Sequence, residues 1–323
     1  MMKTRLSHTG MQKLRFACTV TVYAFCLCGL LESIRHPNDA ILKTMDDNLM
    51  HCDFAQSRFD YINCFLEVYP TSTQLRRDDL VTASDDCIPI FVLFSERISA
   101  LLEVIRSLHK NIRTCFEIVV FDDNSTYAPT IAALKWLERM KELKVHVHYH
   151  KEVWTDFNNL FLQFGKFVES YLAPLNTEVF VINDADCALD SSPPNILSIY
   201  RDILIGNLTG RRLRGVGASI RWDDWPAQSF KMEYERVPRS LPAAAVSVYS
   251  RNFYYIDADV DTTFVMYRKS DEIHRLAKPT IRLLPPLGIR HLDFYIEKEN
   301  IPPDYEVYLS RAKEKRASHM IHI

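Results

Sequence analysis

The feature that most constrains the fold is an alternation of apolar runs with helical patterns between residues 88 and 190. The runs IPIFVLF (88–94), FEIVVF (116–121) and VFVIN (179–183) are almost entirely apolar, which is typical of strands buried on both faces of a parallel sheet. Segment 98–110, between the first two, carries apolar residues at helical spacing. Strands that alternate with helices form right-handed βαβ units, so the sequence predicts an α/β fold with a mostly parallel sheet flanked by helices.

The remaining elements are predicted from the same patterns, which become less regular after residue 190. We expect helices over 128–143, 154–172 and 193–205, and strands over 145–149, 215–222 and 253–267. Prolines predict a loop-rich segment at 278–305, and we expect the basic tail from Arg311 onward to fray. The second half should therefore be mixed rather than a continuation of the parallel pattern.

The charge balance argues against a nucleic-acid partner. The 323 residues include 39 Lys and Arg against 41 Asp and Glu, a net charge of −2. A nearly neutral chain has no general attraction for phosphate backbones, so an anionic ligand must be bound locally, by a metal ion or a few basic side chains. Only 8 glycines occur, and neither GxGxxG nor GxxxxGKS/T is found, which argues against a glycine-rich phosphate loop.

The N-terminus has the pattern of a membrane signal. Residues 1–15 contain four basic residues and no acidic one, and the 16 residues of segment 16–31 carry no charge. A helix of that length spans about 24 Å, slightly less than a bilayer core. Positive charge before the segment favours a cytosolic N-terminus, so we expect a single-pass type II signal anchor of the Golgi or ER membrane. A cleaved signal peptide and a soluble protein are the alternatives. The anchor and the cleaved signal both place the rest of the chain in the secretory lumen.

The expected organisation is a cytosolic tail at 1–15, a signal anchor at 16–31, a stem at 32–85, a folded domain at 86–315 with halves at 88–190 and 191–315, and a tail at 316–323. Cys52 and Cys64 could pair in an oxidising compartment, although free thiols fit the sequence equally well. The sequon Asn207-Leu208-Thr209 is compatible with a lumenal glycoprotein.

Polar residues stand where the predicted strands of the first half end. The first strand is followed by Ser95-Glu96-Arg97, the second by the run Asp122 to Thr126, and the fourth by Asp184-Ala185-Asp186. Ligands of open parallel sheets bind at the carboxyl ends of the strands, so we expect these three ends to converge at one edge.

Asp184 and Asp186 have a spacing that suits metal ligands. Extended backbone alternates sides, so residues two apart present their carboxylates to one face. Hard oxygen donors suit Mg²⁺ or Mn²⁺ bound together with a diphosphate. A solvated turn is the alternative, but the apolar run before them favours buried acids that need a cation or hydrogen bonds.

Asp122 and Asp123 follow the second strand just as abruptly. A carboxylate at this position can accept hydrogen bonds from a base imide or from ribose hydroxyls. The alternative is that the following Asn124, Ser125 and Thr126 only cap the next helix.

The ordered set of strand, S-x-R, DDNST and DxD over residues 88–190 resembles the nucleotide-sugar half of family 2-like glycosyltransferases with the GT-A fold. The resemblance implies a Rossmann-like sheet of the GT-A type with a mixed C-terminal acceptor half. It also implies sugar transfer from a nucleoside diphosphate sugar with Mn²⁺ or Mg²⁺. The motifs assign the nucleotide site to Ser95, Arg97, Asp122, Asp123 and Asp184, and the metal to Asp184 and Asp186. The run Phe94-Ser95-Glu96-Arg97 departs from the usual T-Y-N-R, which leaves the donor base open.

The second half resembles the same family at RWDDWP (221–226) and DVDTTFVMYR (259–268). An inverting transfer needs a carboxylate within hydrogen-bond reach of the acceptor hydroxyl, and the candidates are Asp223, Asp224 and Asp261. Polar turns are the alternative for all three. GT-A enzymes often complete the metal shell with a late histidine, and His291 fits that role, with a purely structural histidine as the alternative.

These observations predict a membrane-anchored, metal-dependent glycosyltransferase that moves a sugar from a nucleoside diphosphate sugar, UDP-sugar being expected, to a glycan or glycoconjugate acceptor. Inversion is expected by analogy with the family. Two alternatives remain. One is a catalytically inactive lumenal binding or scaffold protein of the same fold. The other is a nucleotidyltransferase, which would want an early glycine- and lysine-rich loop that this sequence lacks.

Overall fold

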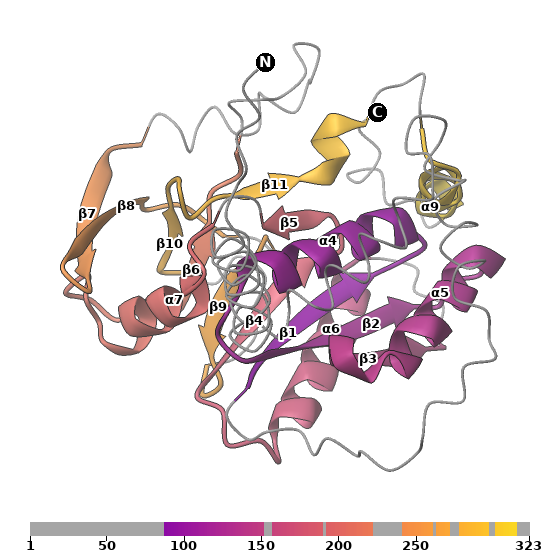
Figure 1. The fold of residues 1–323 in the computed structure, drawn as a ribbon, viewed down its shortest axis with the longest axis horizontal. Helices are drawn as coiled ribbons and strands as arrows, with labels where there is room; N and C mark the ends of the chain where they lie inside the picture. The colour runs from indigo at the N-terminus through magenta and orange to yellow at the C-terminus, as the bar shows by residue number, and fades with distance from the viewer. Residues whose placement is uncertain are drawn as a thin grey trace, which may run out of the picture. The chain divides into compact units, whose positions relative to one another are not determined.

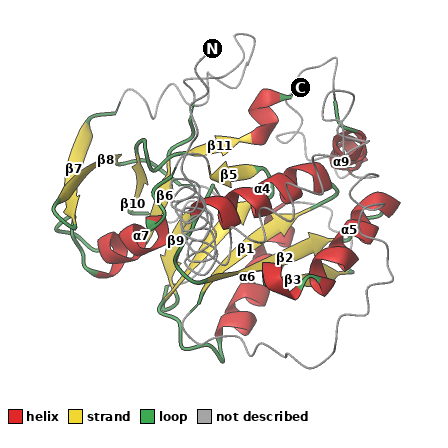
Figure 2. Ribbon diagram, in the orientation of Figure 1, coloured by secondary structure: helices red, strands yellow, loops and turns green. Residues whose placement is uncertain are grey.

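The computed structural model describes residues 87–151, 157–189, 192–221, 241–260, 263–271, 278–296 and 301–314. The expected cytosolic tail, signal anchor and stem lie outside these ranges. The described residues form a nine-stranded sheet of order β3-β2-β1-β4-β9-β6-β10-β8-β7 and a two-stranded sheet of β11 and β5. Helices lie against the larger sheet (Figures 1 and 2). The predicted α/β architecture is therefore confirmed.

The first half alternates strands and helices as its sequence predicts. Its elements are β1 (Ile88–Phe94), α4 (Ile98–Asn111), β2 (Phe116–Asp123), α5 (Ala128–Arg139), a short 3₁₀ helix (Lys141–Leu143), β3 (Val145–His150), α6 (Phe157–Leu172) and β4 (Val179–Asp184). Strands β1 to β4 are parallel where they pair. The predicted helix over 128–143 is shorter than expected, since its last residues form the 3₁₀ helix.

The order of the strands reverses between β1 and β4. The chain moves outward from β1 to β2 and β3, then crosses back to place β4 on the other side of β1. Because these crossovers are right-handed, a reversed direction puts the connecting helix on the opposite face of the sheet. Accordingly, Phe164 of α6 packs in one buried cluster with Phe91 and Phe121 of the sheet. The carboxyl ends of β1 and β4 thus mark the switch point, where open α/β sheets bind ligands.

The second half is mixed, as expected. Its elements are β5 (Cys187–Leu189), α7 (Ile196–Ile205), β6 (Gly215–Ala218), β7 (Ala243–Val248), β8 (Arg251–Ile256), β9 (Val265–Arg268), β10 (Thr280–Leu283), β11 (Ile289–His291), a 3₁₀ helix (Leu292–Tyr295) and α9 (Pro303–Glu314). Strand β9 runs antiparallel to both of its neighbours, β4 and β6.

Three local predictions for the second half are wrong. The single strand expected over 253–267 is two strands, β8 and β9, which are not neighbours in the sheet. Segment 278–305 contains β10, β11 and the start of α9, because its prolines flank elements, and Pro303 occupies the first helical position, where no donor is lost. The tail does not fray at Arg311, which belongs to α9 and forms a buried contact described below.

A disulfide joins Cys87 to Cys115, whose Cα atoms are 4.6 Å apart, at the starts of β1 and β2. The sequence did not indicate this pair, because the two cysteines become neighbours only through the parallel register of Ile88 with Phe116. Cys52 and Cys64 lie outside the described residues. No helix within the described ranges is long and apolar enough to cross a membrane.

Candidate active site at the carboxyl edge of the sheet

The register of β1 with its two neighbours brings the polar strand ends together. Phe94 pairs with Asp122 of β2, and Leu93 pairs with Asp184 of β4. The residues after all three strands therefore leave the sheet at the same edge, at the switch point, as the sequence predicts. Ser95, half-buried, and Arg97 follow β1 directly at this edge.

Four side chains near the carboxyl end of β4 form a group that could hold a metal ion (the metal group). Ligand atoms of Asp184, Asp186, Cys187 and His291 all lie within 4.8 Å of one another. His291 reaches this place because β11 pairs with β5, which sets it opposite Cys187. The amide of Leu292 donates to the carbonyl of Asp186 at 2.7 Å and fixes the two segments.

The chemistry of this group suits a hard divalent cation. The two carboxylates are the oxygen donors that Mn²⁺ and Mg²⁺ prefer, and the imidazole is a donor better suited to a transition ion such as Mn²⁺. Burial, followed by the nearby carboxylates of Asp186 and Asp184, raises the pKa of the Cys187 thiol well above its ordinary value. Thiolate is a soft ligand that Mn²⁺ and Mg²⁺ do not prefer, so Asp184, Asp186 and His291 are the residues that best fit such a metal.

Arg97 joins the turn after β1 to this group. Its Nη1 lies 2.6 Å from Oδ2 of Asp186 and 2.9 Å from Oδ2 of Asp293. The guanidinium also lies over the ring of Tyr308, 4.4 Å from its centre. Burial lowers the pKa of Arg97, but the carboxylates of Asp186 and Asp293 more than offset this, so its pKa is raised. Arg97 therefore remains a cation at every relevant pH.

Asp293 is a site residue that sequence reasoning missed. It accepts hydrogen bonds from Arg97 and, at 3.1 Å, from the hydroxyl of Tyr305. Its position two residues after His291 was the available signal, since that spacing repeats the one between Asp184 and Asp186. Asp186 and Asp293 share the Arg97 guanidinium, and Asp184 lies close to Asp186, so a divalent cation would reduce the excess of negative charge.

The loop after β2 uses its two acids differently. Asp122 accepts from the hydroxyl of Ser125 at 2.5 Å and from its amide at 3.3 Å. Burial raises the pKa of Asp122 to about 6, although the hydrogen bonds from Ser125 act in the opposite direction. Asp123, also buried, is the next residue of an extended strand and points to the other face. Asp122 thus shapes the loop, which leaves Asp123 as the better candidate for contacting a nucleotide.

The three candidates for a general base lie outside the described residues. These are Asp223 and Asp224, with the tryptophans beside them, and Asp261. Their roles stay predictions. His291, by contrast, is placed in the metal group, where its Nδ1 lies 3.4 Å from Oδ2 of Asp186 and its ring stacks on Phe294.

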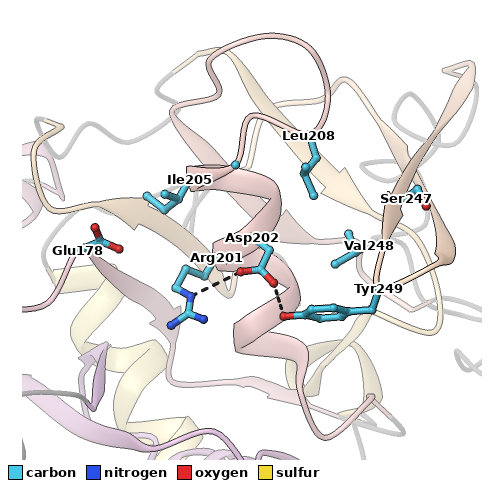
Figure 3. A pocket seen from close by; sticks show the side chains of 9 residues that line it. Glu178, Arg201, Asp202, Ile205, Leu208, Ser247, Val248 and Tyr249 are labelled. Carbon is cyan, nitrogen blue, oxygen red and sulfur yellow. Dashed lines mark hydrogen bonds and ion pairs between the residues drawn. The ribbon is translucent and has the colours of Figure 1, made fainter.

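A separate cavity of about 480 Å³ lies between α7 and the β7–β8 hairpin. Figure 3 shows Asp202 at its centre, in contact with Arg201 and Tyr249. Glu178, which also lines it, precedes β4, so the cavity is at the opposite end of that strand from Asp184. This position separates the cavity from the polar strand ends.

No protein-family model matches the chain, and no curated protein matches it significantly. Solved structures that align with it include the mannosyltransferase PcManGT from Pyrobaculum calidifontis in complex with GDP-Man and Mn²⁺, with a TM-score of 0.38, 13% identity, and coverage of 72% of this chain and 62% of that one. S. aureus TarS 1-349 aligns with a TM-score of 0.39, 17% identity, and coverage of 71% and 65%. GalNAc-T7 with UDP, GalNAc and Mn²⁺ aligns with a TM-score of 0.38, 13% identity, and coverage of 71% and 50%.

Each of these alignments spans less than two thirds of the other protein's chain. The fold of this chain is established by its own strand order, which has the parallel first half and mixed second half expected of the GT-A type. The site is an edge of that sheet where a possible metal group, a fixed arginine and a buried acidic loop meet.

Proposed function

We propose that this chain is a metal-dependent glycosyltransferase of the GT-A type that uses a nucleoside diphosphate sugar, with UDP-sugar as the expected donor. The observation that carries the proposal is the meeting of Asp184, Asp186 and His291 with the loop of Asp123 at one switch point. The first set suits a metal that binds a diphosphate, and the second can accept hydrogen bonds from a base or ribose. Both ends of a nucleoside diphosphate thus find suitable partners at one edge.

The residues have distinct roles in this proposal. Asp184, Asp186 and His291 would hold Mn²⁺ or Mg²⁺, which stabilises the negative charge of the diphosphate as it leaves. Arg97 orients Asp186 through the 2.6 Å ion pair and adds a permanent positive charge near the phosphates. Asp123 binds the nucleoside, while Asp122 holds its loop through Ser125.

The acceptor side of the proposal rests on the sequence. A glycan or glycoconjugate is the expected acceptor, and transfer with inversion requires one of Asp223, Asp224 or Asp261 as general base. We also propose a lumenal location, with a type II anchor in the Golgi or ER membrane. The Cys87–Cys115 disulfide supports it, because such bonds persist in oxidising compartments.

The direct test incubates the full-length chain in detergent with a panel of nucleotide sugars and Mn²⁺, and measures release of the nucleoside diphosphate. We expect hydrolysis or transfer with one donor, abolished by EDTA. Asp186→Asn should lower it by at least about a hundredfold. The matched control, Asp202→Asn, removes the same charge from the separate cavity and should leave the rate unchanged.

Two outcomes would contradict the proposal. A chain that binds UDP with Mn²⁺ but turns over no donor would favour the inactive scaffold. Turnover that survives EDTA and Asp186→Asn equally well would remove the metal group from the reaction.

A further inference from the structure

Glu96, in the turn between β1 and α4, is completely buried although it carries a carboxylate. Its Oε1 accepts hydrogen bonds from the amide of Thr126 at 2.6 Å and from its hydroxyl at 3.0 Å. Its Oε2 accepts from the amide of Tyr127 at 3.1 Å. These donors belong to the loop between β2 and α5, which follows Asp123. The carboxylate of Glu96, which lies in a different turn, therefore holds this loop.

The main chain of Glu96 is bound to the same loop and to the first turn of α5. Its amide donates to the hydroxyl of Ser125 at 2.9 Å, and its carbonyl accepts from the hydroxyl of Thr130 at 2.8 Å. The φ angle of Glu96 is 58°, in the left-handed region, which costs a non-glycine residue about 1–2 kcal/mol. The surrounding hydrogen bonds therefore have to hold this turn in place.

A buried carboxylate is stable only with a charged or hydrogen-bonded partner, and Arg311 of α9 supplies one. Its Nη1 lies 2.5 Å from Oε1 of Glu96, and the side chains are 14% and 0% exposed. Its Nη2 also donates to the carbonyl of Asp123 at 3.5 Å. One arginine therefore contacts both the residue that holds the loop and the backbone of the loop's candidate ligand.

The rest of α9 is fixed to the same edge. The carboxylate of Asp304 accepts from the amide of Ser99 at 2.7 Å, at the start of α4. The ring of Tyr308 lies against Arg97, and Tyr305 donates to Asp293. Successive turns of α9 thus contact the turn after β1 and the neighbourhood of the metal group.

We propose that Glu96 and Arg311 are a pair of positioning residues that hold Asp123 in the orientation needed to bind the nucleoside of the donor. This inference rests on the proposed function. Neither side chain touches the donor. Glu96 fixes the loop after β2, and Arg311 connects that loop to the C-terminal helix. The helix α9 then contributes to the donor site by holding the loop after β2 in position.

The structural half of the inference is tested by hydrogen exchange on the full-length chain. Arg311→Met and Glu96→Gln remove the ion pair with little change of volume. The amides of Thr126 and Tyr127 should exchange at least about tenfold faster in both variants, because their acceptor is lost or reoriented. Glu306→Gln, an exposed position on the same helix, is the control and should leave exchange unchanged. Unchanged exchange in both variants would show that the pair does not hold the loop.

The functional half is tested by calorimetric titration of UDP in the presence of Mn²⁺. Each single variant should raise the dissociation constant for UDP at least about tenfold. The dissociation constant of the double variant should be within about twofold of that of the weaker-binding single variant, because the two side chains act as a unit. Arg311→Lys should recover part of the affinity. The dissociation constant for Mn²⁺ alone should stay within about twofold of the wild-type value, since the candidate metal ligands are unchanged in these variants.

The outcomes separate this inference from the proposed function. If the wild-type chain binds UDP and the variants bind it equally well, while their thermal midpoints fall, the pair is merely structural and the inference is wrong. If the wild-type chain binds no UDP, GDP or other nucleoside diphosphate, the proposed function fails, and the donor-site role of the pair fails with it. The exchange measurement still decides whether the pair holds the loop.

Discussion

Replacing Arg97 by methionine tests the electrostatic account of the site. The guanidinium is 12% exposed and lies between Asp186 and Asp293, which are 2% and 9% exposed. Methionine preserves much of the volume and the contact with Tyr308, but it leaves the carboxylates without this cation. Breaking a buried ion pair by removing one partner costs about 3–5 kcal/mol. We therefore expect a loss of stability in that range.

The expected shift can be read from thermal denaturation. For a domain of this size, each kcal/mol changes the midpoint by about 2–4 °C, so Arg97→Met should melt about 6–20 °C lower than the wild type. The control is Arg211→Met. Arg211 pairs with Asp257 at the surface, with side chains 42% and 61% exposed. An exposed pair of this kind contributes less than about 1 kcal/mol.

Manganese should restore part of the loss. A divalent ion at a hundred times its dissociation constant stabilises the folded state by about 2.7 kcal/mol. The rise in midpoint should be larger in Arg97→Met than in the wild type, because Asp186 is no longer engaged by the arginine. The reasoning is refuted if Arg97→Met has the same thermal midpoint as the Arg211→Met control, or if Mn²⁺ raises the midpoint of neither Arg97→Met nor the wild type.

Three further predictions follow from other contacts. Asp186→Ala should abolish Mn²⁺ binding and donor hydrolysis while the circular dichroism spectrum is unchanged, and retained turnover would exclude Asp186 from the metal site. The pKa of Asp122 is raised from 3.8 to about 6, mainly by burial, so its protonated form favours the fold. This contribution to stability is complete below about pH 4 and is lost as the pH rises through about 6. Urea unfolding of the wild type should therefore show a free energy of unfolding that falls by up to about 3 kcal/mol over this range, and Asp122→Asn should lack this fall. An identical fall in both proteins would contradict the prediction. Replacing Cys87 and Cys115 by serine opens a link with a sequence separation of 28 and should lower the free energy of unfolding by about 3–4 kcal/mol, whereas an unchanged urea midpoint would argue against the bond.

The first half of the fold was predictable because its elements are encoded locally. Continuous apolar runs gave β1 and β2 with bounds within two residues, since strands buried on both faces need apolar residues at every position. The meeting of Asp122 and Asp184 beside β1 followed from the general rule that parallel strands end at the same edge.

The parts that were missed depend on contacts distant in the sequence. The partner of Glu96 stands 215 residues later in the chain, in a segment whose prolines and basic charge indicated a loop and a tail. Cys87 and Cys115 meet only through strand register, and Asp293 joins the site through the pairing of β11 with β5. None of these contacts leaves a local periodic pattern.

The central claim is that a metal and a nucleoside diphosphate bind together where β1, β2 and β4 end. Anomalous diffraction from crystals grown with Mn²⁺ and UDP measures this most directly. We expect one manganese peak between Asp184, Asp186 and His291, with the diphosphate on the metal and the uridine beside Asp123. A manganese peak elsewhere on the chain, or UDP bound away from the loop of Asp123, would contradict the account.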